Sequence, residues 1–289
     1  MTILSFGEPE YQISSLENAR AAVLPLCYEH SVSYGTGAVS GPLHILSASV
    51  QLEMMDEETF IHWGKIGIHT LPPLYPSNDP EAAVREMQRA AADVLSRKKF
   101  LLSLGGDHAI SIGPIMAAAR IFPGMAVLQV DAHLDLRDTW NGSRYNHACV
   151  IRRVIEDARL PVIQVGIRSF SPEEAEYIRT HNLSPCFAHQ IPPDTSEWIK
   201  KIVDQLPEHV YMTIDLDGLD PSVLPGTGTP EPGGLSYRQL VSLIREVGQS
   251  RKVVAADINE LSIIEGTHVS EFTAAKIASK ILVYCVDCS

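Results

Sequence analysis

Residues 125–138 read MAVLQVDAHLDLRD, and this stretch decides how the fold is interpreted. Its first six residues form an apolar run of strand-like composition, and three carboxylates and a histidine crowd the residues that follow. A strand that is apolar on both faces is typical of a parallel sheet covered by helices. Charge at the end of such a strand is costly unless a partner compensates it. Something in the folded protein must therefore neutralise these side chains.

The rest of the chain repeats this pattern of short apolar runs separated by segments of helical period. The further strand candidates are residues 21–28, 99–105, 161–167, 210–217 and 252–258. One helix is predicted to begin after Asp79, an N-cap candidate before Pro80, and to end at the basic residues 97–99. The other helix candidates are residues 111–121, 148–158, 172–181, 236–247 and 270–284. This alternation predicts an α/β fold with a mainly parallel sheet.

Composition narrows the class of protein. The chain has 289 residues, 45% of them hydrophobic, and no linker or repeat divides it, so we predict a single domain over residues 1–289. The net charge is −12 and the basic residues are scattered, which argues against a nucleic-acid partner. Such a negative field suits a small cationic substrate.

The cysteines and the apolar runs indicate where the protein works. The five cysteines are Cys27, Cys149, Cys186, Cys285 and Cys288. Their odd count and lack of a zinc motif predict reduced thiols in a cytosolic protein. The N-terminal residues 1–11 lack the features of a signal peptide, and no apolar run has membrane-spanning length. We therefore expect a cytoplasmic protein without a membrane partner.

Charged residues follow three of the predicted strands at the point where each strand ends. These clusters are GGDH at 105–108, DAHLD at 131–135 and DLD at 215–217. In a mainly parallel sheet, ligands bind at the edge formed by the carboxyl ends of the strands. Residues two apart in a continuing strand face the same side, so Asp131, His133 and Asp135 are predicted to converge.

Together the clusters predict a metal centre. The candidate ligands are His108, Asp131, His133, Asp135, Asp215 and Asp217. Four carboxylates and two imidazoles favour Mn²⁺, with Fe, Ni and Zn as alternatives, and a bound cation would neutralise them. Six ligands suit two ions that share a carboxylate and hold a hydroxide between them as nucleophile. A lone His108 is more often a core residue, but three such clusters favour a metal site. The long Gly/Pro loop 217–235 and Glu260 are placed to line the same pocket.

These motifs resemble those of the ureohydrolase family, which includes arginases and agmatinases. The matching segments are residues 105–108, 131–135, His147, residues 215–221 with 225–234, and residues 257–260. Residues 33–46 and 270–281 are also similar to family segments, so the resemblance spans nearly the whole chain. It implies a three-layer α/β/α sandwich with a mainly parallel central sheet, two Mn²⁺ per chain and a homo-oligomer, either a trimer or a hexamer.

The resemblance also implies roles for individual residues. It assigns His108, Asp131, Asp135 and Asp217 to one ion or to the bridge, and His133, Asp131, Asp135 and Asp215 to the other. His147 resembles the proton shuttle of the family, and Glu260 resembles the carboxylate that holds the guanidinium. With Asp135 they are the candidate catalytic residues. A hydroxide bridging two Mn ions would attack the guanidinium carbon, and urea and an amine would leave.

Several residues bear on which family member this is. Arg137 stands where arginases have an Asn that binds the amino-acid end of arginine, so the resemblance is closest to agmatinase. It implies hydrolysis of agmatine to putrescine and urea, a step of polyamine biosynthesis. The segment NHAC at 146–149 and the segment ELSIIEG at 260–266 depart from the usual family pattern. Aminopropylagmatine, guanidine and guanidinobutyrate, whose carboxylate Arg137 would suit, therefore stay open as substrates.

Two hypotheses from other classes are weaker. A deacetylase with one Zn²⁺ on a related fold would need an Asp-x-His and a distant Asp, but not His108, Asp135 and Asp215 as well. A non-catalytic paralogue that serves as a binding or regulatory subunit would be expected to lose metal ligands, and none of the six is lost.

Overall fold

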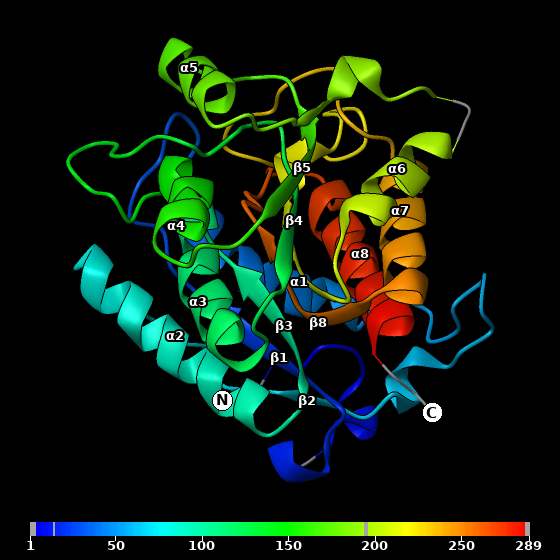
Figure 1. Cartoon of the computed structure of the whole chain (residues 1–289). Helices are drawn as coiled ribbons and strands as arrows, with labels where there is room; N and C mark the ends of the chain where they lie inside the picture. The colour runs from blue at the N-terminus through cyan, green and yellow to red at the C-terminus, as the bar shows by residue number, and fades with distance from the viewer. Residues whose placement is uncertain (1–3, 14, 194–195, 287–289) are drawn as a thin grey trace.

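The computed structural model describes residues 4–13, 15–193 and 196–286 and is built around a parallel β-sheet (Figure 1). Within these residues the sheet has eight strands in the order β2-β1-β3-β8-β7-β4-β5-β6, and neighbouring strands pair in parallel. The strands are β1 (Ala21–Leu26), β2 (Ile68–Thr70), β3 (Phe100–Gly105), β4 (Ala126–Val130), β5 (Val162–Ile167), β6 (Cys186–Phe187), β7 (His209–Asp215) and β8 (Lys252–Asn259). The predicted α/β fold with a parallel sheet is confirmed.

Helices cover both faces of the sheet, so the molecule has three layers (Figure 1). The helices on one face are α1 (Gly41–Ser49), α6 (Glu197–Gln205), α7 (Tyr237–Ser250) and α8 (Val269–Cys285). The helices on the other face are α2 (Pro80–Ser96), α3 (Ile112–Ile121), α4 (Val150–Glu156) and α5 (Pro172–Thr180). The buried apolar residues accordingly form two clusters. The predicted α/β/α sandwich is confirmed.

Strand β4 shows why the strands are apolar on both faces. Leu128 and Val130 pack into the cluster that contains α6 to α8, whereas Val127 packs into the cluster that contains α2 to α4. Side chains alternate between the two faces of a strand, so a sheet covered on both sides buries each of them. The strand predicted over residues 125–131 is β4, but it does not continue through Asp135, so strand alternation is not what brings Asp131, His133 and Asp135 toward one pocket. The ladder ends at Val130, and the chain turns away so that Asp135 has a φ of 52°.

The remaining elements match the sequence expectations in part. Each predicted strand and helix is present, with ends that differ by a few residues, and the Asp79 side chain caps α2 as predicted. Strands β2 and β6, with three and two residues, are too short to give a periodic signal. Helices α1 and α6 were also not predicted, because α1 begins with Gly41-Pro42 and α6 follows a polar, proline-rich segment.

Two further expectations concern the cysteines and the membrane. Cys27, Cys149, Cys186 and Cys285 are free thiols. Cys288 and the first three residues of the chain lie outside the described residues. Among the described helices, none combines the length and the apolar character that crossing a membrane requires.

Candidate metal centre

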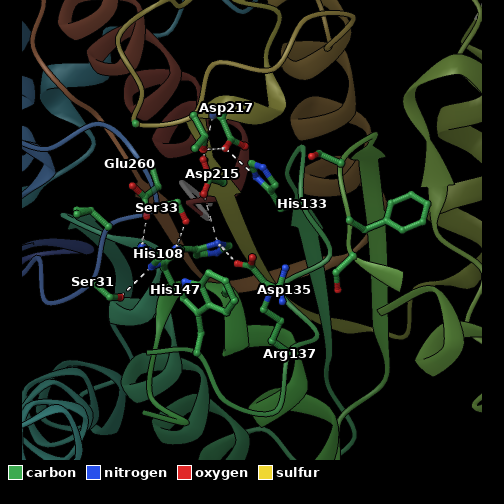
Figure 2. Close-up of a pocket in the computed structure, with 18 of the residues that line it drawn as sticks. Ser31, Ser33, His108, His133, Asp135, Arg137, His147, Asp215, Asp217 and Glu260 are labelled. Carbon is green, nitrogen blue, oxygen red and sulfur yellow. Dashed lines mark hydrogen bonds and ion pairs between the residues drawn. The ribbon is translucent and has the colours of Figure 1, made fainter. Parts of the chain in front are cut away.

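The ends of three strands bring the predicted ligands together. Strands β3, β7 and β4 end at the same edge of the sheet, with β8 between β3 and β7. His108 opens a short 3₁₀ turn after β3, Asp131 follows β4 directly, and Asp215 is the last residue of β7. Figure 2 shows His108, His133 and the carboxylates of β7 and its following turn pointing into one pocket.

His108 lies at the centre of the first group of ligands. Its Nδ1 lies 2.9 Å from Asp135 Oδ2, 3.2 Å from Asp131 Oδ2 and 3.4 Å from Asp215 Oδ2. These four side chains are buried, yet Nδ1 lacks an aligned hydrogen bond to any of the three oxygens. A buried ring nitrogen left facing carboxylates fits a site built for a cation.

His133 forms the second group. Its Nδ1 lies 3.0 Å from Asp217 Oδ2 and 3.5 Å from Asp131 Oδ1. Asp131 therefore turns one oxygen toward each histidine and belongs to both groups. Asp215 lies with His108 and Asp217 lies with His133, whereas the resemblance implied the reverse pairing, and which ion each carboxylate would bind stays a prediction. A 3₁₀ turn follows β7, so Asp217 does not continue the strand from Asp215.

The electrostatics of the site are those of crowded carboxylates. Burial and the charge of Asp131 raise the pKa of Asp135 to about 7. Burial and the charges of Asp217 and Asp131 raise the pKa of Asp215 well above its usual range. Burial alone would lower the pKa of His133, but Asp217 and Asp131 raise it to about 12. Each shift reduces the net negative charge of the cluster, as bound divalent cations would do instead.

A buried network beneath the ligands holds His108. Its Nε2 lies 2.8 Å from Thr213 Oγ1, and Thr213 donates to Asp257 Oδ1 at 2.6 Å. Tyr211 donates to the other oxygen of Asp257 at 2.6 Å. Asp257 is therefore a buried support for the site and does not line the pocket. Beside it, Gln129 Nε2 donates to Asp131 Oδ2 at 2.6 Å.

The two other candidate catalytic residues also reach the pocket, which has a volume of about 260 Å³. Glu260 has a φ of 67°, and its Oε1 accepts a hydrogen bond of 2.7 Å from the His108 backbone N–H. Burial raises its pKa well above the usual range. His147 lies in a 3₁₀ turn, and burial followed by the charges of His108 and His133 lowers its pKa to about 4.

The outer wall of the pocket contains Arg137. Its guanidinium stacks over the ring of Trp140 at 4.2 Å, and both residues line the cavity. Gly228 and Thr229 of the loop 217–235 form another part of the wall, as predicted for this loop. Arg168 fixes the loop by donating to the carbonyl oxygens of Asp217 at 2.6 Å and Glu231 at 2.7 Å.

The comparison with known families agrees with this geometry. The Arginase family model matches residues 19–284. The chain belongs to the arginase family. It is an arginase-family ureohydrolase, a hydrolase that acts on C–N bonds.

Individual relatives of this ureohydrolase cover nearly its full length. An N(1)-aminopropylagmatine ureohydrolase from Synechocystis sp. is 39% identical, over 94% of this chain and 91% of the relative. An agmatinase from Pyrococcus horikoshii is 30% identical, over 91% of this chain and 90% of the relative. The agmatine ureohydrolase of Thermoplasma volcanium superposes with a TM-score of 0.86 at 30% identity, over 94% of this chain and 92% of that one.

Some residues that shape the site of this ureohydrolase were not predicted. They are Ser31 and Ser33 beside His147, Thr213 beneath His108, and Arg168 behind the loop. The sequence gives a weak signal only for Thr213, which precedes Asp215 by two residues and therefore faces the same side of β7. The serines and Arg168 act on residues 49 to 116 positions away, and no local pattern indicates such contacts.

Proposed function

We propose that this ureohydrolase hydrolyses the guanidino group of agmatine, or of agmatine that carries an aminopropyl extension, and releases urea and an amine. The observation that carries the proposal is Asp131, which is shared between the groups of His108 and His133, because both histidines line one pocket with half-buried Glu260. Relatives named N(1)-aminopropylagmatine ureohydrolase, at 31–39% identity, favour the extended substrate. Agmatine is the substrate expected from the sequence.

The donor set of the site fits a pair of divalent cations. The unpartnered Nδ1 of His108 and the crowded buried carboxylates support this assignment. We propose two Mn²⁺ per chain, because oxygen-rich sites with imidazole suit this ion. When bound, such a pair supplies Lewis acidity and makes water a nucleophile at neutral pH. One ion would be held by His108, Asp135 and Asp215, and the other by His133 and Asp217. Asp131 would contribute to both.

The other residues of the pocket act on the substrate. Glu260 would bind the guanidinium, and the positive charge of the guanidinium would favour the ionised form of this half-buried carboxylate. His147 has a pKa lowered to about 4, so its imidazole is neutral near pH 7 and can accept a proton. The proton accepted from the attacking water would then be passed to the nitrogen of the leaving amine, because an amine leaves more readily when it is protonated.

Three further properties of the protein belong to the same proposal. We propose that residues 1–289 form one domain, that the enzyme works in the cytoplasm, and that it assembles as a homo-oligomer, either a trimer or a hexamer. The free thiols of the described cysteines support a reducing compartment. Light scattering coupled to size-exclusion chromatography tests the assembly, and a monomeric mass would contradict it.

A panel of guanidino compounds tests the substrate. Urea release is measured for N(1)-aminopropylagmatine, agmatine, 4-guanidinobutyrate and arginine with the Mn²⁺-loaded enzyme. We expect urea from the first two, with the higher kcat/KM for the extended substrate, and little from arginine. Urea from arginine alone, or from none of the four, would overturn the proposal.

One observation favours a second candidate, a guanidino acid. The guanidinium of Arg137 lies in the pocket wall, where it would attract the carboxylate of 4-guanidinobutyrate and repel a terminal ammonium. A higher kcat/KM for 4-guanidinobutyrate than for agmatine in the same panel would identify this substrate instead.

A further inference from the structure

Two serines on the loop between β1 and α1 hold the imidazole of His147 at both ring nitrogens. Ser31 Oγ lies 2.8 Å from Nδ1, and Ser33 Oγ lies 2.9 Å from Nε2 (Figure 2). We infer that Ser31 and Ser33 are positioning residues, which set the orientation in which His147 handles the proton. This inference rests on the proposed role of His147 as proton shuttle.

The chemistry of the serine hydroxyl suits this task. A hydroxyl group both donates and accepts hydrogen bonds, whereas each nitrogen of a neutral imidazole does only one or the other. The two serines therefore satisfy the ring in either tautomer, and they also satisfy it after it gains a proton. Because they contact opposite ring nitrogens, rotation of the ring breaks both hydrogen bonds. The orientation of the ring can thus be kept through a proton transfer.

The loop has anchors of its own, so it does not depend on His147 for its position. Buried Asp107 uses Oδ2 to accept hydrogen bonds from the backbone N–H groups of His30 at 2.9 Å and Ser31 at 3.2 Å. On the far side of Ser33, the Gly35 N–H donates to the Gly228 carbonyl oxygen at 3.0 Å. The serines are therefore held from both ends of the segment.

A third anchor lies further along the same loop. The carboxylate of Glu29 accepts hydrogen bonds from the backbone N–H groups of Gly37 at 3.0 Å and Val39 at 3.2 Å. These hydrogen bonds join the two ends of the segment 29–39. A catalytic group held by residues that are themselves fixed is the arrangement expected when geometry limits the rate.

Kinetics of single variants test the positioning role. Ser31→Ala and Ser33→Ala each remove one hydroxyl, and we expect each to lower kcat about tenfold with KM changed less than about twofold, because orientation of the proton carrier affects the chemical step. Ser33→Thr keeps the hydroxyl and should restore most of kcat. Ser40→Ala is the matched control and should keep the wild-type kcat. The Ser40 hydroxyl donates to the Gly37 carbonyl oxygen of the same loop at 2.9 Å and not to His147. Bound metal and the thermal midpoint should match the wild type in each variant.

A double-mutant cycle separates positioning from a general effect on the fold. His147→Asn should lower kcat about 100-fold, as loss of a proton-transfer group does. In that background, Ser31→Ala should add no further loss, because the hydroxyl then has no imidazole to orient. An unchanged kcat in the serine variants, or a full additional tenfold loss in the His147→Asn background, would overturn the inference.

The same measurements distinguish failure of this inference from failure of the proposed function. Absence of urea release by the wild type would contradict the proposed function itself. Unchanged kcat in His147→Asn would contradict the shuttle role and, with it, the positioning role. Loss of kcat in His147→Asn together with unchanged kcat in both serine variants would contradict only the positioning role.

Discussion

Arg137 places a positive charge in the wall of a pocket that is otherwise rich in carboxylates. Its guanidinium lies over Trp140, and both residues line the cavity that a substrate would enter. A fixed cation repels a second cation within a few ångströms and attracts a carboxylate. The interaction energy is about 1 kcal/mol in a water-filled site and larger in a site without water. The effect of replacing Arg137 on kcat/KM therefore reports the charge of the substrate tail.

Replacement of Arg137 by Gln separates the two candidate substrate classes. If the tail of the substrate carries an ammonium, kcat/KM should rise a few-fold because the repulsion is removed. If the tail carries a carboxylate, kcat/KM should fall about tenfold or more because a charge-assisted hydrogen bond is lost. Arg144→Gln is the matched control, because Arg144 also stacks on an aromatic ring, that of Tyr145, and pairs with Asp157 away from the pocket lining. A fall in kcat/KM for agmatine-type substrates would contradict the proposed polyamine substrate.

Among the elements, the two central strands β7 and β8 support the candidate metal ligands from below. Thr213 on β7 connects the His108 ring to Asp257 on β8, which pairs with it in register. Such an outer hydrogen bond fixes the orientation of a metal-binding imidazole and typically contributes 10–100-fold to metal affinity.

Thr213→Val tests this support with almost no change in volume. It leaves the Nε2 of His108 without its partner, whereas Asp257 Oδ1 keeps the hydrogen bond of 2.7 Å from the Asn259 amide, so Mn²⁺ affinity should fall about 10–100-fold because the imidazole loses its support. Thr213→Ser keeps the hydroxyl and should bind Mn²⁺ nearly as the wild type does. Calorimetric titration of the metal-free variants with Mn²⁺ measures the difference. Equal affinities for the Val and Ser variants would show that the hydrogen bond does not support the centre.

The elements also show what can be predicted from the sequence. Runs that are apolar on both faces, such as β4, can be recognised as strands from the sequence. Strand ends that carry Asp and His identify the edge of the sheet where the candidate metal centre lies. The spacing of Asp215 and Asp217 did not predict their partners, because the strand ends at Asp215 and a 3₁₀ turn follows. The short edge strands β2 and β6 are defined by pairing with β1 and β5, not by any local pattern.

At the scale of the whole molecule, a buried ion pair joins α8 to the segment before β2. Lys280 Nζ lies 2.5 Å from Asp56 Oδ2 and 2.9 Å from Glu57 Oε1, and the Lys280 side chain is fully buried. Lys280→Met would leave Asp56 buried without its main partner, so the free energy of unfolding should fall by about 3–5 kcal/mol. Lys276→Met is the matched control from the same helix, because its pair with Glu57 is more exposed and contributes about 1 kcal/mol or less. Chemical denaturation at pH 7 measures both, and equal losses would contradict the account.

The same pair makes a prediction about pH. Burial would raise the pKa of Asp56, but the hydrogen bonds from Lys280 and Thr59 outweigh burial and lower it. Because the pKa of Asp56 is lower in the folded state, ionised Asp56 stabilises the protein at pH values above its unfolded-state pKa of about 3.9. This stabilisation is lost as the pH falls through the folded-state pKa. The stability difference between wild type and Lys280→Met should therefore be largest near pH 7 and should shrink below about pH 4. Denaturation curves from pH 7 to pH 3 test this, and a constant difference would contradict it.

Distance along the chain explains what the sequence could not predict at this scale. The six candidate ligands fall into short motifs, so their residue types and spacing are visible locally. Ser31 and His147 are 116 positions apart, and Lys280 lies 224 positions from Asp56, so only the packed layers bring each pair together.

We propose that the carboxylates and histidines at the edge of the sheet form a two-ion centre for urea release. A titration of the chelator-treated enzyme with Mn²⁺ tests this centre, with bound metal and urea release from agmatine and N(1)-aminopropylagmatine measured together. We expect negligible urea release before metal is added and a rise to a plateau at about two Mn²⁺ per chain. Full urea release by the metal-free enzyme, or a plateau at one ion per chain, would contradict it.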